Sequence, residues 1–250
     1  MPYQPIAAAP NRKNRFTVGV ETFYDRYEEP DTFPDLGVNA YYGALDVGWE
    51  HYFNPKWYSN LETRFSYGKA DYKSNSGKVN NITDYELEGR FTGGYDMPMG
   101  AGKHFKTYAG LGMRQYLDYF KKDSVPGTYD RRIFQVYAPI GVTYEFSSGG
   151  WTFAPNFELN PLIYGYVQSR LQTIPGLETA SNLQRDNGGM GYRAEFMMSR
   201  LSSDGRGWQF GPFIRYWDIE DSNVDLNASG AWVEPRNTRL QAGAKLKYLF

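Results

Sequence analysis

The sequence contains no cysteine and only two histidines among its 250 residues. The absence of cysteine excludes thiol nucleophiles, disulfides and zinc sites with thiolate ligands. Its 27 basic and 28 acidic side chains give a formal charge of -1, so the basic excess typical of nucleic-acid-binding proteins is missing. No stretch approaches the roughly 18 consecutive apolar residues of a membrane-spanning helix. Spanning strands remain possible, because they distribute their apolar residues in alternation.

Aromatic side chains and alternation are abundant instead. Aromatic residues make up 18% of the chain, and ten segments alternate apolar with polar residues as strands do. In the first of them, Phe16, Val18 and Val20 share one face, whereas Glu21 and Asp25 share the other. The ten segments are 16–25, 41–53, 57–67, 85–96, 105–118, 134–145, 151–163, 192–199, 208–216 and 239–250.

The apolar face has a composition that favours lipid rather than a protein core. It carries bulky aromatic residues at both ends of the strands and smaller aliphatic residues between them, as lipid-facing bands flanked by aromatic girdles do. The polar face carries glycine and charges of both signs in strand after strand. One predicted girdle includes Phe16, Trp57, Phe105 and Trp208, and the other includes Tyr24, Tyr41, Tyr67, Tyr85 and Tyr216.

The connections between the segments also alternate in length. Long ones span about residues 28–38, 70–82, 120–131, 168–188 and 219–235, and the connections between them are short turns. This asymmetry is typical of outer-membrane barrels. We therefore predict an all-β fold, a ten-stranded antiparallel transmembrane β-barrel with short periplasmic turns and long extracellular loops. The barrel would occupy residues 15–250, and residues 1–14 would form a periplasmic tail.

The end of the chain resembles the C-terminal assembly signal of Gram-negative outer-membrane β-barrel proteins. Leu246, Tyr248 and Phe250 stand at every second position, and the chain ends on phenylalanine. The resemblance implies export to the bacterial outer membrane and folding by the barrel-assembly machinery. The first residues do not resemble a signal peptide. We therefore expect a mature form to which Met1 was added.

The inward face of the predicted barrel is rich in charge. Ten strands lie between the eight whose interior side chains fill and the sixteen or more that leave a channel. We favour a packed network of ion pairs that closes the lumen, with inward tyrosines such as Tyr108, Tyr137 and Tyr164 adding bulk. The alternative is a narrow conduit with a charge filter. The predicted network residues are Glu62, Arg64, Glu86, Glu88, Arg90, Arg114, Glu158, Arg193, Glu195, Arg215 and Arg239.

A catalytic site is not expected. Ten strands with acidic residues resemble the omptin proteases, which combine acidic pairs with a histidine at the extracellular rim. Here His51 is expected on the lipid-facing side and His104 at a periplasmic turn, so neither reaches that rim. We predict no catalytic residue, no cofactor and no metal. The segment 221–227 alternates oxygen-bearing side chains as calcium loops do, but Leu226 stands where such a loop needs glycine.

Apolar residues in two long loops are the candidates for contact with a partner, namely Leu171, Ile174, Leu177, Leu226 and Trp232. We expect a non-enzymatic surface or envelope protein that binds an extracellular ligand or an envelope partner through these loops. The alternatives are a small passive pore and an omptin-like or lipid-modifying hydrolase. The other expected partners are outer-membrane lipid and the assembly machinery, and no nucleic acid.

Substitutions on the two faces test the predicted orientation of the strands. Arginine at the lipid-facing Val47 or Leu111 should impair insertion, whereas serine at the inward Gly110 should be mild by comparison.

Overall fold

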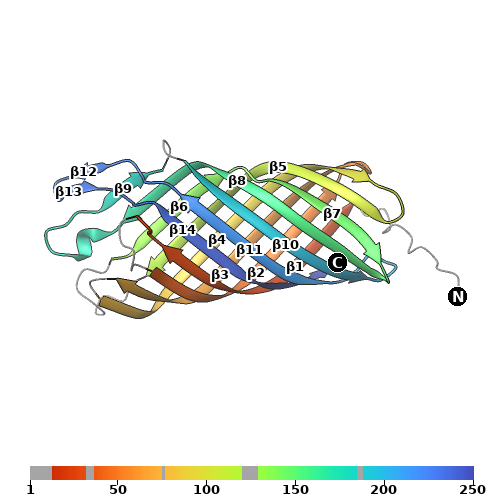
Figure 1. Ribbon diagram of the computed structural model, residues 1–250, viewed down its shortest axis with the longest axis horizontal. Helices are drawn as coiled ribbons and strands as arrows, with labels where there is room; N and C mark the ends of the chain where they lie inside the picture. The colour runs from red at the N-terminus through yellow and green to blue at the C-terminus, as the bar shows by residue number, and fades with distance from the viewer. Residues whose placement is uncertain (1–12, 32–36, 75–76, 120–128, 185–187) are drawn as a thin grey trace.

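The computed structural model describes residues 13–31, 37–74, 77–119, 129–184 and 188–250. Among these residues, no helix combines the length and the hydropathy needed to cross a bilayer. Antiparallel strands form a barrel whose long axis lies horizontally in Figure 1. The elements are β1 (Asn14–Glu28), β2 (Gly37–Tyr52), β3 (Trp57–Ser74), β4 (Gly77–Pro98), β5 (Lys103–Tyr119), β6 (Arg131–Tyr137), β7 (Ile140–Ser148), β8 (Trp151–Ser169), η1 (Leu171–Thr173), β9 (Ala180–Leu183), β10 (Gly189–Leu201), β11 (Gly207–Ile219), β12 (Asp225–Asn227), β13 (Gly230–Trp232) and β14 (Asn237–Leu249).

The barrel is closed by pairing of its first and last strands. β14 pairs antiparallel with β1, and Tyr248 lies opposite Val18. β6 and β7 together occupy one position between β5 and β8, so the wall has the ten strands that the sequence predicts. The split falls at Pro139, which has no N–H to donate to a ladder. Ala138 N donates instead to Pro161 O at 3.0 Å.

The two faces of the wall have the predicted orientation. The exposed fractions of Leu45, Phe91 and Leu111 are 60%, 56% and 54%, whereas those of Glu88 and Glu158 are 4% and 0%. Soluble proteins show the opposite preference and rarely expose continuous apolar surface. The outer wall is therefore suited to hydrocarbon, as in membrane-spanning barrels.

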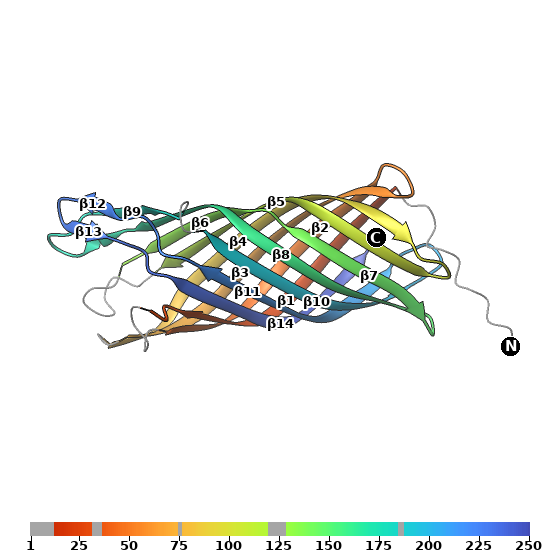
Figure 2. The same cartoon turned by 45° about the horizontal axis from the view of Figure 1, so that its top comes forward.

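The two ends of the barrel differ. The start of β1, the end of β14 and the four short turns lie at one end, and β9, β12 and β13 extend from the other (Figures 1 and 2). The prediction of a long loop over residues 70–82 is wrong, because β3 and β4 continue as paired strands beyond the barrel wall. Ala70, Val79 and Ile82 still point inward and are 1–5% exposed, so their burial supports the extended hairpin.

Gly110 does not behave as expected from its inward position. A Cβ atom there would lie 2.0 Å from Phe91 O and 2.7 Å from Thr92 Cα. Backbone atoms cannot yield as the end of a flexible side chain can. The prediction that Gly110→Ser is mild is therefore wrong, since glycine is needed for the close approach of β4 to β5.

Tyr164 is a second departure. The register between β6 and β8 shifts between Val136 and Tyr137, whose partners are Tyr164 and Leu162. This bulge inserts one residue and reverses the alternation beyond it. Tyr164 consequently packs against Phe134 on the outer face, with ring centroids 6.4 Å apart, and does not fill the lumen.

Candidate functional site

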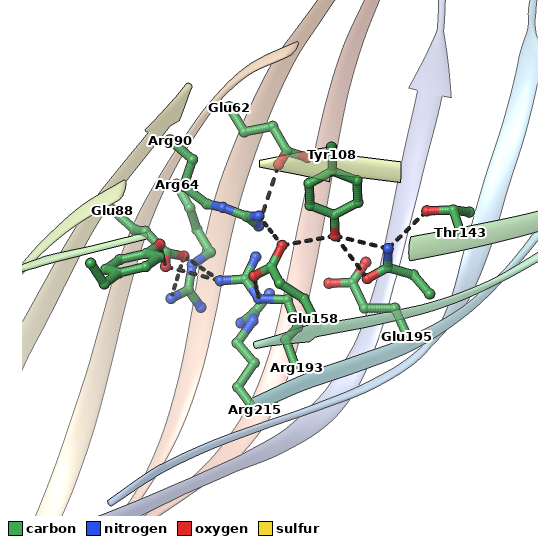
Figure 3. A network of polar contacts seen from close by, with 12 residues as sticks. Glu62, Arg64, Glu88, Arg90, Tyr108, Thr143, Glu158, Arg193, Glu195 and Arg215 are labelled. Carbon is green, nitrogen blue, oxygen red and sulfur yellow. Dashed lines mark hydrogen bonds and ion pairs between the residues drawn. The ribbon is translucent and has the colours of Figure 1, made fainter. Parts of the chain in front are cut away.

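Buried ion pairs cross the middle of the lumen (Figure 3). Arg90 on β4 contacts Glu158 on β8 and lies 3.4 Å from Glu62 on β3. Tyr108 on β5 donates a hydrogen bond to Glu158 Oε2 at 2.8 Å. The side chains thus come from β3, β4, β5 and β8 and meet inside the lumen.

Glu88 is one of the carboxylates at which several of these contacts converge. Its Oε1 atom accepts hydrogen bonds from Arg193 Nη2 at 2.9 Å and from Tyr137 Oη at 2.5 Å. Its Oε2 atom lies 3.2 Å from Arg64 Nη2. Arg64 in turn donates a hydrogen bond to Glu86 at 2.6 Å. Glu88 therefore contacts two buried cations at once, and Glu86 and Glu158 supply further negative charge to them.

A third group connects β1, β10, β11 and β14. Arg215 Nη2 lies 2.9 Å from Glu21 Oε1, and Lys245 Nζ lies 3.4 Å from Glu21 and 2.7 Å from Glu195. The space left within the charged cluster around Arg64, Arg90 and Arg193 is about 10 Å³. A single water molecule needs a space of roughly 10–15 Å³.

Arg114 and Arg239, the remaining two predicted network residues, lie nearer the extracellular end. Arg239 Nε donates to Asp25 Oδ2 at 2.8 Å, and its guanidinium lies 3.8 Å from the ring centre of Tyr116. Arg114 Nε donates to Gln135 Oε1 at 2.6 Å. Its guanidinium lies over the ring of Trp217 at 3.5 Å. The structure therefore assembles all eleven predicted residues inside the barrel, in successive levels along its axis.

The sequence analysis predicted Tyr137 to point inward but missed the other aromatic residues that form a layer with it inside the barrel. Phe23 stacks on Tyr42 with ring centroids 4.9 Å apart and meets Phe213 edge-on at 5.9 Å. Tyr137 meets Trp217 at 5.1 Å. The available signal was position, because Phe23 stands two residues from Glu21 and from Asp25 and so shares their inward face.

A polar cavity of about 200 Å³ lies on the periplasmic side of the network. At the periplasmic end of this cavity, Lys106 Nζ lies 2.8 Å from Glu145 Oε1. Both histidines are at this end of the barrel. His104 Nδ1 lies 2.8 Å from Asp96 Oδ1, and the His51 ring packs between Trp49 and Phe53 on the outer face. The extracellular rim thus has no histidine of the kind that omptins use.

A second buried cluster lies at the extracellular mouth. Tyr27 Oη donates to Glu29 Oε1 at 2.8 Å, and Arg131 Nη1 lies 3.0 Å from Glu234 Oε1. Burial raises the pKa of Glu234 to about 7, Glu29 adds to the increase, and Arg131 opposes it. The cluster fastens the segment before β14 to β1 and β6.

Hydrogen bonds join two extracellular segments into what we call the platform, residues 171–183 and 222–233. Asn223 N donates to Leu183 O at 2.9 Å, and Ser181 N donates to Asp225 Oδ2 at 2.8 Å. Asn182 Nδ2 donates to Trp232 O at 2.9 Å. Because side-chain and backbone groups both contribute, the β12–β13 hairpin has a defined orientation on β9.

The hairpin presents one apolar face and one polar face. Leu226 pairs with Ala231, so both share a face with Val224 and Val233, and Leu226 is 78% exposed. Trp232 lies on the opposite face and donates Nε1–H to Asn227 Oδ1 at 3.2 Å. Of the other three loop residues predicted to contact a partner, Ile174 and Leu177 are half-buried. Leu171 is 2% exposed, so its side chain is buried and the prediction that it contacts a partner is wrong.

The segment weighed as a calcium loop uses its oxygen atoms within the protein. Asp221 Oδ1 accepts a hydrogen bond from Arg236 N at 2.6 Å, and Asn227 Oδ1 accepts one from Ser229 N at 2.9 Å. Within the described ranges, no three acidic or histidine side chains are grouped as metal ligands.

The C-terminal residues lie in the wall at the periplasmic end. Phe250 N donates to Phe16 O at 2.9 Å, and the ring of Tyr248 packs against those of Trp208 and Phe250, each at 5.0 Å. Leu246 and Phe250 face outward with exposed fractions of 41% and 49%. Their recognition by an assembly machinery stays a prediction. So does the tail, because residues 1–12 lie outside the described residues and Asn14 already belongs to β1.

No protein-family model and no curated protein sequence matches the chain. Among solved structures, the outer membrane protease OmpT from Escherichia coli is similar with a TM-score of 0.59 and 9% identity, over 95% of this chain and 96% of that one. The translocator domain of the autotransporter NalP from Neisseria meningitidis has a TM-score of 0.48 and 8% identity, over 95% and 88% of the two chains.

At such identities the OmpT likeness concerns the fold and not the activity. The fold agrees with the closed ten-strand wall, the apolar exterior and the unequal ends. The chain is a ten-stranded antiparallel β-barrel of the outer-membrane type.

Proposed function

We propose that this protein is a non-conducting, non-enzymatic surface barrel that acts through its extracellular platform. The observation that carries the non-conducting part of the proposal is the space of about 10 Å³ inside the charged cluster. An ion with even part of its hydration shell needs more room than one water molecule. Widening that space requires separating buried charges, each of which loses its partner at considerable cost.

The absence of an extracellular histidine supports the non-enzymatic part. His104 is engaged with Asp96 at the periplasmic end, and His51 lies among aromatic side chains on the lipid-facing side. Glu29 and Glu234 at the extracellular mouth are buried in the cluster with Tyr27 and Arg131, where a large substrate has no access.

Planar-bilayer recordings test the closed lumen. We expect the wild-type protein to insert without stable single-channel steps at either polarity. A variant with Glu88, Arg193 and Arg215 replaced by alanine should produce such steps, because it removes side chains that cross the lumen. Stable steps from the wild-type protein would contradict the proposal. They would favour the small pore, for which the polar cavity of about 200 Å³ is the supporting observation.

The platform supports the recognition part of the proposal. It is fixed by hydrogen bonds in advance, so a partner that binds it loses little loop entropy. It also exposes Val224, Leu226 and Val233 on one face of the hairpin. Exposed apolar side chains gathered on a rigid element are typical of interaction sites.

Site-specific photocrosslinking on intact cells tests recognition by this face. A crosslinking amino acid at Leu226 should form a discrete adduct on the cell surface. Trp232 is the matched control position. It lies opposite Asp225 on the other face of the same hairpin, so a crosslinking amino acid there should form no adduct. Equal labelling at both positions, or none at Leu226, would show that the apolar face has no dedicated partner.

A further inference from the structure

A groove of about 660 Å³ crosses the outer wall over β3, β4 and β5. Phe65 and Leu87 line the part of the groove nearer the middle of the wall and lie opposite each other, with exposed fractions of 46% and 55%. The part nearer the extracellular end reaches Tyr85 and Tyr119 in the extracellular aromatic girdle. The groove therefore extends from the hydrocarbon band to the level of the lipid headgroups.

Two polar side chains interrupt the apolar lining. Thr83 and Gln115 point outward from β4 and β5, where the wall otherwise carries apolar residues. Each accepts a hydrogen bond from a cation of a flanking strand. Lys69 Nζ donates to Thr83 Oγ1 at 2.7 Å, and Arg132 Nη2 donates to Gln115 Oε1 at 3.2 Å. The acceptors are neutral, so they hold both cations over the groove and leave their charges uncompensated.

Two other cations near the extracellular end of the barrel are neutralised. Arg26 contacts Glu28, and Arg236 Nη2 lies 2.8 Å from Asp218 Oδ2. In contrast, neither Lys69 nor Arg132 has a carboxylate within 4.0 Å in the part of the chain that the structure describes. This edge of the groove thus presents two positive charges where the headgroups of the outer leaflet begin.

The spacing of these charges indicates the kind of headgroup. Thr83 lies opposite Tyr119, and Gln115 lies opposite Leu87 four residues along β4. Four strand residues span about 13 Å. Lys69 on β3 and Arg132 on β6 are also three strand spacings apart, which is about 14 Å across the wall. One phosphate would contact both cations only if their side chains left Thr83 and Gln115, whereas two phosphates on one headgroup can contact both in place.

We propose that this groove binds a lipid of the extracellular leaflet whose headgroup carries two phosphates. Its acyl chain packs along Phe65, Leu87 and Leu117, and its phosphates pair with Lys69 and Arg132. The charges are complementary, and phosphates pair strongly with lysine and arginine in partly desolvated positions. The site is independent of the lumen network and of the platform.

Native mass spectrometry of the full chain in a neutral detergent measures this binding. Bis-phosphorylated lipid A is the probe, with monophosphorylated lipid A and inorganic phosphate as comparators. We expect bis-phosphorylated lipid A to bind the wild-type protein best, and inorganic phosphate to leave its binding unchanged at equal concentration. The combined substitution Lys69→Gln and Arg132→Gln should weaken binding at least about tenfold, because two charge-assisted contacts are lost.

Arg26→Gln is the matched control, because Arg26 also faces outward above the girdle but is paired with Glu28 and lies away from the groove. It should bind the probe as the wild-type protein does. Lys69→Arg retains the charge and should retain binding, which separates loss of charge from misfolding. Equal binding of the probe by wild type and the double variant would overturn the proposal. Equal wild-type binding of mono- and bis-phosphorylated lipid would overturn the assignment of two phosphates.

Discussion

Glu88→Ala should lower the free energy of unfolding of the inserted barrel by about 3–5 kcal/mol. The substitution removes the acceptor of Arg193 Nη2 and Tyr137 Oη and the anion beside Arg64. Arg64 and Arg193 are 4% and 6% exposed, so water cannot replace the lost carboxylate. Equilibrium unfolding by guanidinium in phosphocholine vesicles, followed by tryptophan fluorescence, measures the change.

Two comparisons identify the cause of that loss. Arg26→Ala removes an exposed ion pair with Glu28 and should cost less than about 1 kcal/mol. Combining Glu88→Ala with Arg193→Ala should cost less than the sum of the two single changes, because the second removes a cation that the first leaves unpaired. A loss as small as that of Arg26→Ala would contradict the view that the network is tightly buried.

Leu111→Arg should destabilise the inserted barrel by about 2–4 kcal/mol, the cost of a cation at the midplane of the lipid-facing surface. Leu111 is 54% exposed on the outer face of β5, about midway between Phe105 and Tyr119. Its guanidinium would have neither water nor a carboxylate there. The same unfolding experiment measures the change, and the fraction of folded protein after insertion gives a second readout.

Leu111→Met is the control, since it conserves volume and polarity and should cost less than about 1.5 kcal/mol. Val47→Arg should repeat the effect of Leu111→Arg from β2, because Val47 is 48% exposed on the same outer surface. If Leu111→Arg inserts and unfolds as the wild-type protein does, the outer wall does not face hydrocarbon and the orientation of every strand must be reversed.

The sequence determined the architecture because alternation is a local property. Phe16, Val18 and Val20 opposite Glu21 and Asp25 require a strand with one apolar and one charged face, and ten such segments require a wall. Loop lengths then distinguished the two ends. The same alternation identified the charged residues that point inward, since Glu62, Glu88 and Arg193 all fall on the polar face.

Pairing across the lumen could not be predicted in this way. Arg215 meets Glu21 at a separation of 194 residues, and Arg193 meets Glu88 at a separation of 105. Such contacts depend on barrel diameter, strand stagger and side-chain rotamers together. The alternation also misled at Tyr164, where a bulge reversed the faces, and at Gly110, where the neighbouring backbone comes within 2.0 Å of a Cβ position.

The sequence by itself determined the strand number, the two faces and the unequal ends. These features follow from the alternation of apolar and polar residues and from the loop lengths, both of which are local properties of the chain. Only the tertiary structure decided which charges meet, that the charged cluster retains about 10 Å³, and that Lys69 and Arg132 overhang a lipid-facing groove. These features arise where strands distant in sequence curve together, and closure of the barrel sets their spacing.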